Sequence, residues 1–361
     1  MVGRRVGGQA GLAAAGSSDQ PIMALHSRPR FRLRAAAADE RLAARPAVAC
    51  GWRVAVTACS GAMVTDFLVT DRPTAGPVLL GIDVGLSALK VAAFDAAGRL
   101  LGRASRTYPP RRIEADRVEE DPEQWLTLAA AAVRELLAGG VCRPAQVAGI
   151  GLSARGSGPV FVDAAGRALA PHWLDRRHAP QSRRLTERFG PYADTRSLPS
   201  KTLHLAEHYP ELFARLAHPL FVKDFLLYRL TGAVATDPSS GPRGLVWPRE
   251  VWDWIGFPVE RVPPVRPHTA IGGRLLPAMA AAFGLPAGLP VGVGGHDGAC
   301  ANTGAGAILP GQVCLTLGTN GVARSIAAAP APTVPWQNAG VPPRLGGGQR
   351  GVLAAPIAVG R

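Results

Sequence analysis

Lysine is scarce in this sequence, although the chain is strongly basic. Of the 40 residues that are lysine or arginine, only Lys90, Lys201 and Lys223 are lysine. A formal net charge of +14 usually indicates a polyanionic partner. Here, however, the arginines are spread among Ala, Gly and Pro, and no basic stretch alternates with aromatic residues as a nucleic-acid groove requires. We therefore interpret the charge as a compositional bias and expect no nucleic-acid partner.

Paired cysteines and long apolar runs are also lacking. No Cys-x-x-Cys pair and no Cys/His metal spacing occurs among the five cysteines, which are Cys50, Cys59, Cys142, Cys300 and Cys314. An odd and scattered set favours reduced thiols in a cytoplasm over a disulfide framework. No stretch approaches the length that crosses a membrane. We therefore expect a cytoplasmic protein without a membrane partner.

Composition divides the chain into three regions. Residues 1–76 mix Arg, Ala, Gly and Ser with few acids, which predicts a disordered or spurious extension rather than a transit peptide. From Pro77 the pattern is regular, and a content of 47% hydrophobic and 18% charged residues indicates a sizeable globular core. From Ala327 the pattern fails again, and we predict no clear element there.

The regular region alternates strands and helices. An antiparallel meander is predicted over 78–83, 88–94 and 99–107, with small-residue turns between its strands. A helix is predicted from the cap residue Asp121 to a stop at Gly139. Further strands are expected over 147–153, 159–162, 290–295 and 312–317, and helices over 178–189, 201–208, 210–217, 223–231 and 277–284. This order predicts an α/β fold with an antiparallel start.

One carboxylate lies in a glycine turn that the rest of the chain frames. Asp297 follows Gly294, Gly295 and His296, after a short apolar strand and before a small-residue helix start. A carboxylate between a strand end and a helix N-terminus faces a crevice, which is a common place for a catalytic base. The alternative is that Asp297 only caps the helix, since Asp is among the best N-caps.

The first predicted strand ends in an acid and a small-residue turn. Gly85 lets a ligand approach the backbone, and the N–H groups of Leu86 and Ser87 can point at an anion. Asp83 could hold Mg²⁺ directly or through water, since Mg²⁺ takes one or two carboxylates and keeps most of its waters. Lys90 could reach a phosphate. The alternative is an ordinary hairpin, which needs a glycine turn in any case.

A later strand, 312–317, runs into a similar turn. Gly318, Thr319 and Gly321 can form a second anion cradle. Two such turns with one carboxylate between them suit phosphoryl transfer. The base accepts the proton of a substrate hydroxyl, while a metal and backbone donors neutralise the phosphoryl oxygens.

In their order along the chain, these motifs resemble the FGGY carbohydrate kinases, and most of all the xylulokinases among them. The resembling stretches are residues 81–90, 120–125, 150–156, 173–177, 223–237, 294–297 and 317–321. The resemblance implies an α/β fold of the RNase H-like or actin-like ATPase type. It also implies that residues 77–308 form a complete N-terminal, sugar-binding lobe and that residues 309–361 are only the start of a C-terminal, ATP-binding lobe.

The resemblance further implies a kinase that uses ATP and Mg²⁺ to phosphorylate a hydroxyl of a small sugar or polyol, such as the pentulose xylulose. Asp297 would be the general base, and Asp83 would lie near the metal and the phosphates. The nucleotide would be bound by Asp83, Gly85, Leu86, Ser87, Lys90, Gly318, Thr319 and Asn320. The sugar would be bound by Arg155, Gly156, Trp173, Asp175 and Asp237. Trp173 also fits a core position, and Asp237 also fits a cap before Pro238.

The sequence departs from the family pattern in three places. Leu86 stands where Thr is usual, and Arg155-Gly156 occupies the place where xylulokinases carry Met-His-Gly, so the sugar stays open. The family's second lobe continues far beyond residue 321, whereas the readable pattern here stops near Ala327, so we expect a truncated kinase. The alternatives are a non-catalytic sugar-binding remnant and, from charge alone, a nucleic-acid-associated protein. A homodimer also stays open.

Overall fold

The computed structural model describes residues 68–69, 75–114, 116–156, 158–190, 193–194, 197–240, 247–317, 321–327, 337–341 and 350–357. All of them belong to one compact unit, Arg53–Arg361. The extension predicted over residues 1–76 lies almost entirely outside these ranges, and so do Gly318, Thr319 and Asn320 of the second predicted anion cradle.

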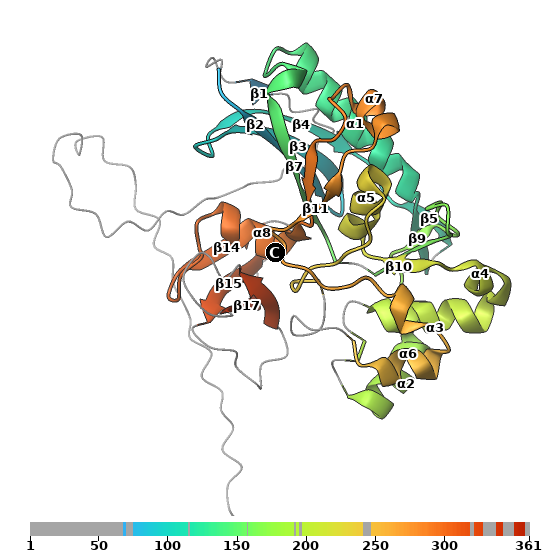
Figure 1. The fold of residues 1–361 in the computed structure, drawn as a ribbon. Coiled ribbons are helices and arrows are strands. Elements are labelled where there is room, and N and C mark those ends of the chain that lie inside the picture. Colours follow the sequence, from blue (N-terminus) through green and yellow to red (C-terminus); the bar gives the residue numbers. More distant parts are fainter. Residues whose placement is uncertain are drawn as a thin grey trace, which may run out of the picture. The chain divides into compact units, whose positions relative to one another are not determined.

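One large mixed sheet is the central element of the described structure (Figure 1). Its strands lie in the order β1-β4-β3-β2-β7-β12-β11, and β13 also pairs with β7. They are β1 (Leu68–Val69), β2 (Val78–Val84), β3 (Ala88–Asp95), β4 (Leu100–Thr107), β7 (Val147–Ala154), β11 (Ile271–Arg274), β12 (Pro290–Gly292) and β13 (Gly295–His296). The meander β2–β3–β4 is antiparallel, whereas β7 pairs in parallel with β2, β12 and β13. The predicted antiparallel start of an α/β fold is therefore confirmed.

Three helices share a hydrophobic core with this sheet. They are α1 (Pro122–Ala138), α5 (Val222–Thr231) and α7 (Pro277–Phe283). Every second residue of β2 is buried, and the helices add Trp125, Phe225 and Phe283, each 0% exposed. Burial of each such side chain contributes about 1.5–3 kcal/mol. The helix predicted from Asp121 is confirmed as α1, where the Asp121 carboxylate accepts the N–H of Glu123 at 3.0 Å.

A second hydrophobic cluster lies among α2 (Ala179–Phe189), α3 (Leu198–His208), α4 (Pro210–Arg215) and α6 (Arg249–Ile255). Its largest buried side chains include Trp247 and Trp252. The short elements near it are β5 (Arg111–Glu114), β6 (Arg117–Glu120), β8 (Val160–Val162), β9 (His172–Trp173), β10 (His218–Leu220), η1 (Pro144–Gln146) and η4 (Val259–Arg261). Sequence analysis missed α6, because its two turns between Pro248 and Gly256 are too short for a persistent helical period.

Beyond α8 (Asp297–Gly304), a four-stranded antiparallel sheet has the order β14-β15-β17-β16. Its strands are β14 (Val313–Leu317), β15 (Gly321–Ala327), β16 (Gln337–Val341) and β17 (Arg350–Ile357). The prediction of no clear element after Ala327 was therefore wrong. The sequence of β17 does not alternate polar and apolar residues, and its register is fixed by pairing with all of β15. The local sequence pattern therefore could not predict β17.

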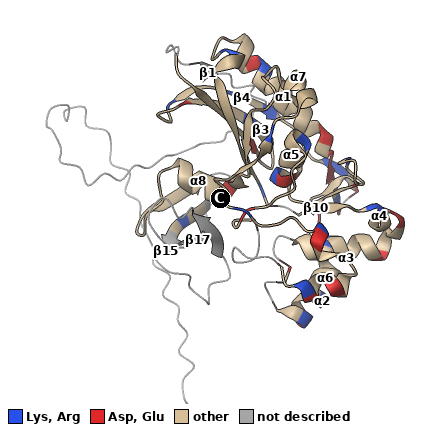
Figure 2. Ribbon diagram, viewed as in Figure 1, with Lys and Arg blue, Asp and Glu red and all other residues tan. Residues whose placement is uncertain are grey.

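Charged side chains of both signs are interspersed along the described ribbon (Figure 2). Within the described ranges, no helix combines the length and the apolar character that a membrane crossing needs. Cys142, Cys300 and Cys314 are free thiols, and the other two cysteines lie outside the described residues.

Candidate active site

Three parallel strands end side by side at one edge of the large sheet. Ala154 of β7 pairs with Val84 of β2 on one side and with His296 of β13 on the other. The residues that follow these partners are Gly85 and Asp297. Because neighbouring strands lie about 4.8 Å apart, the backbone at Gly85 is two strand spacings, about 10 Å, from that at Asp297. The first predicted anion turn and the predicted base therefore share one edge of the sheet.

Asp297 is the first residue of α8 and follows a turn that only glycine allows. Gly294 has a φ of +73°, and a Cβ there would lie 2.1 Å from the carbonyl oxygen of Leu152. His296 is the N-cap, with its Nδ1 3.1 Å from the amide nitrogen of Gly298. The alternative that Asp297 is the N-cap is therefore wrong. Its carboxylate is 40% exposed and accepts the N–H of Gly298 at 2.6 Å.

The carboxylate of Asp83, at the end of β2, lines a cavity of about 520 Å³ between the sheet and α8. Ser153 donates a hydrogen bond to it at 2.8 Å, and Lys90 Nζ lies 4.0 Å from its other oxygen. Burial raises the pKa of Asp83, against the opposing effects of Ser153 and Lys90. Among the described residues, no three His, Cys, Asp or Glu side chains cluster as a metal site. A metal here would therefore depend on one carboxylate together with water and phosphate.

The first anion turn itself is open. Leu86 is 60% exposed, and Ser87 is also exposed. A Cβ on Gly85 would lie 3.1 Å from the carbonyl oxygen of Ala88, so a larger residue would crowd the turn. The backbone of this turn is therefore accessible to a ligand.

A buried group, here called the loop-support network, holds the carbonyl of Gly85. Its members are Tyr108, Glu120 and Arg155. Arg155 is 6% exposed and donates to the Gly85 carbonyl, to Glu120 and, at 2.8 Å, to the Tyr108 hydroxyl. The Tyr108 hydroxyl donates to the same carbonyl. The structure thus places the guanidinium of Arg155, which was predicted to bind the sugar, under the first anion turn.

Burial shifts both acids of the loop-support network towards their protonated forms. It raises the pKa of Tyr108 to about 12, so the hydroxyl keeps the proton that it donates to Gly85. It also raises the pKa of Glu120 to about 7, although the charge of Arg155 acts in the opposite direction.

A second buried group, here called the turn-support network, lies behind the turn that carries Asp297. Its members are Lys223, Asp224, Asp237 and Ser239. Lys223 Nζ contacts Asp224 and lies 3.0 Å from Asp237 Oδ1, and these three side chains are at most 2% exposed. Asp237 Oδ2 accepts both the N–H and the hydroxyl of Ser239, and Ser239 Oγ accepts the N–H of His296 at 2.9 Å.

Asp237 is a structural anchor in this arrangement. Burial opposes its ionisation, but the charge of Lys223 and the hydrogen bonds from Ser239 and Ser240 outweigh that effect and lower the pKa. Its side chain is 0% exposed, so both oxygens face the protein. The structure thus places this predicted sugar residue behind the turn rather than at a cavity.

The remaining predicted sugar residues lie around a second cavity, of about 710 Å³. Gly156 and Asp175 line it, together with Lys201. Trp173 is 3% exposed and packs edge-on against Phe161, with ring centroids 5.3 Å apart. Trp173 therefore occupies a core position, which the sequence also allowed.

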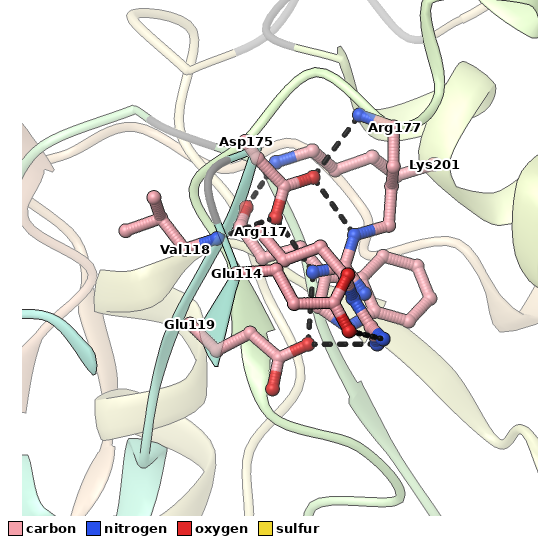
Figure 3. Close-up of polar contacts among 8 residues, drawn as sticks. Glu114, Arg117, Val118, Glu119, Asp175, Arg177 and Lys201 are labelled. Atoms are coloured by element: carbon pink, nitrogen blue, oxygen red, sulfur yellow. Dashed lines mark hydrogen bonds and ion pairs between the residues drawn. The ribbon is translucent and has the colours of Figure 1, made fainter. Parts of the chain in front are cut away.

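Hydrogen bonds fix the orientation of Asp175 (Figure 3). Its carboxylate accepts the N–H of Val118 at 2.9 Å and two bonds from Arg177, at 2.6 and 2.8 Å. Arg177 also bonds Glu119 at 2.8 Å and lies over the ring of Trp173. Burial opposes ionisation of Asp175, but these hydrogen bonds outweigh it and lower the pKa. The wall of the cavity therefore carries a fixed, ionised carboxylate.

Sequence analysis gave no role to several residues of these groups, which are Tyr108, Glu120, Lys201, Lys223, Asp224 and Ser239. The scarcity of lysine in the sequence could have indicated two of these residues, Lys201 and Lys223. Lys201 lines the 710 Å³ cavity, Lys223 supports the turn, and Lys90 lies beside Asp83. In a chain biased towards arginine, a lysine indicates a position where a compact ammonium and a planar guanidinium are not equivalent.

The large sheet and the helices packed on it form a fold of the actin-like ATPase type. Residues 78–304 match the model of the FGGY family of carbohydrate kinases, N-terminal domain. The match covers more than half of the chain, which therefore belongs to this family. The expected α/β fold with part of a second lobe is confirmed.

Similar proteins are xylulose kinases. The xylulose kinase of Bacillus subtilis strain 168 is 33% identical over 263 residues, which are 68% of this chain and 52% of that protein. The xylulose kinase of Escherichia coli K12 is 30% identical over 263 residues, 67% of this chain and 53% of that protein. The chain thus spans about half the length of these relatives.

Solved structures agree on the fold. The crystal structure of a xyloylose kinase from Brucella ovis has a TM-score of 0.68 at 26% identity and covers 78% of this chain and 60% of that one. The xylulose kinase from Rhodospirillum rubrum has the same TM-score at 23% identity, with 78% and 61% covered, and supports the fold alone.

Proposed function

We propose that this chain phosphorylates a hydroxyl of a sugar or polyol with ATP, that a pentulose such as xylulose is the favoured substrate, and that Asp297 is the general base. The observation that carries the proposal is the sheet edge shared by Asp297 and the Gly85 turn, in a chain of the FGGY family. Family membership supports the reaction class, and the names of the relatives support the sugar class.

In this proposal Asp297 accepts the proton of the attacking hydroxyl. Its carboxylate is 40% exposed, so a substrate can reach it. The N–H of Gly298 donates to one oxygen of the Asp297 carboxylate and so restricts the orientation of this base. A positioned general base typically contributes about 10² to 10⁴ in rate.

The residues of the first anion turn fit a nucleotide and Mg²⁺. Gly85 leaves its backbone free of a side chain, and the carboxylate of Asp83 lines the 520 Å³ cavity, where it would hold a metal directly or through water. When bound, Mg²⁺ neutralises charge on the phosphoryl oxygens. Lys90, 55% exposed beside Asp83, would add a positive charge. The predicted contribution of residues 318–320 lies outside the described residues.

We propose the 710 Å³ cavity as the sugar side of the site. Gly156 leaves room for the ligand, and the ionised Asp175 supplies a fixed negative charge at the cavity wall. Burial lowers the pKa of Lys201 to about 8, and this side chain lines the same cavity. Arg155, Trp173 and Asp237 are buried, so their part in sugar binding would be exerted through the residues that they hold.

We also propose a cytoplasmic location. Cys142, Cys300 and Cys314 are free thiols, as a reducing compartment maintains them. Burial raises the pKa of Cys142 and of Cys300, the latter to about 11, so these thiols are poorly reactive.

A coupled assay of ADP release by the full chain tests the reaction. Turnover is expected with D-xylulose, with other pentuloses and polyols as comparisons, and Asp297→Asn should lower kcat by at least about 100-fold. Asp253→Asn is the matched control, because Asp253 is exposed on α6 and the change removes the same charge. Equal activity of Asp297→Asn and the unaltered chain would contradict the role of the base.

The alternative function is sugar binding without turnover, for which the 710 Å³ cavity lined by Gly156 and Asp175 would suffice. It predicts that xylulose raises the thermal unfolding temperature of the chain while ATP has no effect and no ADP is released. A chain that neither releases ADP nor responds to any sugar would contradict both functions.

A further inference from the structure

The hydrogen bond between Ser239 and the N–H of His296 has a fixed direction. A serine hydroxyl has one hydrogen and two lone pairs, and an ionised carboxylate only accepts. The hydrogen of Ser239 therefore points to Asp237, and its oxygen is left to accept the N–H of His296 at 2.9 Å. Lys223, 3.0 Å from Asp237, favours the ionised carboxylate that this direction requires.

The segment that carries Ser239 is itself held in place. The N–H of Thr236 donates to the carbonyl of Pro264 at 2.9 Å, and the N–H of Arg266 donates to the carbonyl of Thr236 at 2.8 Å. Lys223 stands in the first turn of α5, which packs in the main core. The Ser239 oxygen that accepts the His296 N–H thus belongs to a rigid part of the fold. His296 immediately precedes Asp297.

We propose that Ser239, oriented by Asp237 and Lys223, is a positioning residue for the transfer reaction. By accepting the N–H of His296, it sets the backbone from which Asp297 projects. The inference rests on the proposed role of Asp297 as the base. Removal of the acceptor takes away this hydrogen bond to the His296 N–H and lets the turn shift, whereas Gly156 and Asp175 lie at a separate cavity. The loss should therefore appear in kcat and not in the KM of the sugar.

Amide hydrogen exchange tests the positioning without any need for activity. Ser239→Ala in the full chain should make the His296 amide exchange at least about tenfold faster. Ser240→Ala is the matched control. The Ser240 hydroxyl also donates to Asp237, at 2.7 Å, whereas the His296 N–H donates to Ser239. Unchanged exchange in Ser239→Ala, or equal acceleration in Ser240→Ala, would overturn the inference.

Kinetics supply the second readout. Ser239→Ala should lower kcat by about 10- to 100-fold, because a small misplacement of a reacting group costs about that much. The KM for xylulose should change by no more than about threefold. A raised KM at unchanged kcat would overturn the positioning role. Absence of ADP release from the unaltered chain would contradict the proposed function, while the exchange experiment would still decide the positioning.

A second variant keeps the test decisive if Ser239→Ala does not fold. Ser239→Cys retains a weak donor and a weak acceptor of similar size. Its His296 amide should exchange faster than in the unaltered chain and faster than in Ser240→Ala. Exchange equal to that of the unaltered chain would show that the oxygen of Ser239 does not hold the turn.

Discussion

The two loops of the candidate site are held by buried networks of different charge balance. The loop-support network sets one carboxylate, Glu120, against one guanidinium, Arg155, whereas the turn-support network sets Asp224 and Asp237 around the single ammonium of Lys223. Burial raises the pKa of Glu120 to about 7, but Asp237 has a lowered pKa. The single carboxylate of the first network can therefore take up a proton when its cation is lost, whereas Asp237 of the second network stays ionised and depends on Lys223. This difference predicts unequal responses to the loss of a partner.

Lys223→Met should have the largest effect, because it leaves two carboxylates buried together. Loss of one partner of a buried ionic cluster costs about 3–5 kcal/mol. We therefore expect the free energy of unfolding, measured by urea denaturation at neutral pH, to fall by about that amount.

Lys90→Met is the matched control, since Lys90 is 55% exposed and 4.0 Å from Asp83. Exposed pairs at such distances contribute about 0–1 kcal/mol, so its unfolding free energy should hardly change. If the two methionine variants lost equal stability, the ammonium of Lys223 would not be the centre of its network.

Arg155→Met should cost less, about 2–3 kcal/mol at pH 6, because Glu120 can then be buried as a neutral acid. Above pH 7 the loss should grow, because Glu120 of the folded unaltered chain then ionises beside Arg155, whereas burial without Arg155 keeps Glu120 of the folded variant protonated. Urea denaturation at both pH values measures the difference. A loss that is the same at pH 6 and pH 8 would contradict the contrast between the networks.

The pH dependence of the unaltered chain should show Glu120 directly. Its pKa is about 7 in the folded protein against an ordinary 4.5, so the folded state binds the proton more tightly than the unfolded chain. The stability gained from this proton is complete below pH 4.5 and is lost as the pH rises through 7. We expect Glu120 to contribute a fall of about 2 kcal/mol between pH 5 and pH 7.5, against a rise from the buried His172, His178 and His204, whose pKa values burial lowers.

Glu120→Gln should remove this contribution, because the amide does not titrate. Some slope should remain, since burial also raises the pKa of Asp224 to about 6. Denaturation curves at closely spaced pH values would compare the two chains. An unchanged slope in the Gln variant would assign the pH dependence to other groups.

Features that depend on neighbouring residues could be predicted from the sequence. The turn at Gly294 needs a positive φ, and the burial of every second residue of β2 follows from its alternating pattern. The cap at Asp121 is equally local. These signals placed the strands of the meander, helix α1 and the turn that carries Asp297.

The direction of long side chains could not be predicted, because their partners are distant in the sequence. Arg155 follows the strand next to the site, yet it bonds Glu120 and Tyr108, 35 and 47 residues away. Ser239 bonds His296, 57 residues away. The sequence therefore identified the residues around the site better than it distinguished those that can touch a ligand from those that hold the loops.

Tyr108→Phe should have the smallest effect, about 1 kcal/mol. The variant removes one donor to the Gly85 carbonyl, but Arg155 still donates to that carbonyl, so no buried acceptor is left alone. Tyr228→Phe on α5, outside both networks, is the matched control, and urea denaturation at pH 7 measures both. A loss above about 3 kcal/mol would mean that the hydroxyl, and not the guanidinium, is the main support of the turn. In that case the pair of Glu120 and Arg155 would not be the main support of the Gly85 turn. The contrast between this pair and the turn-support network would then no longer describe how the two loops are held.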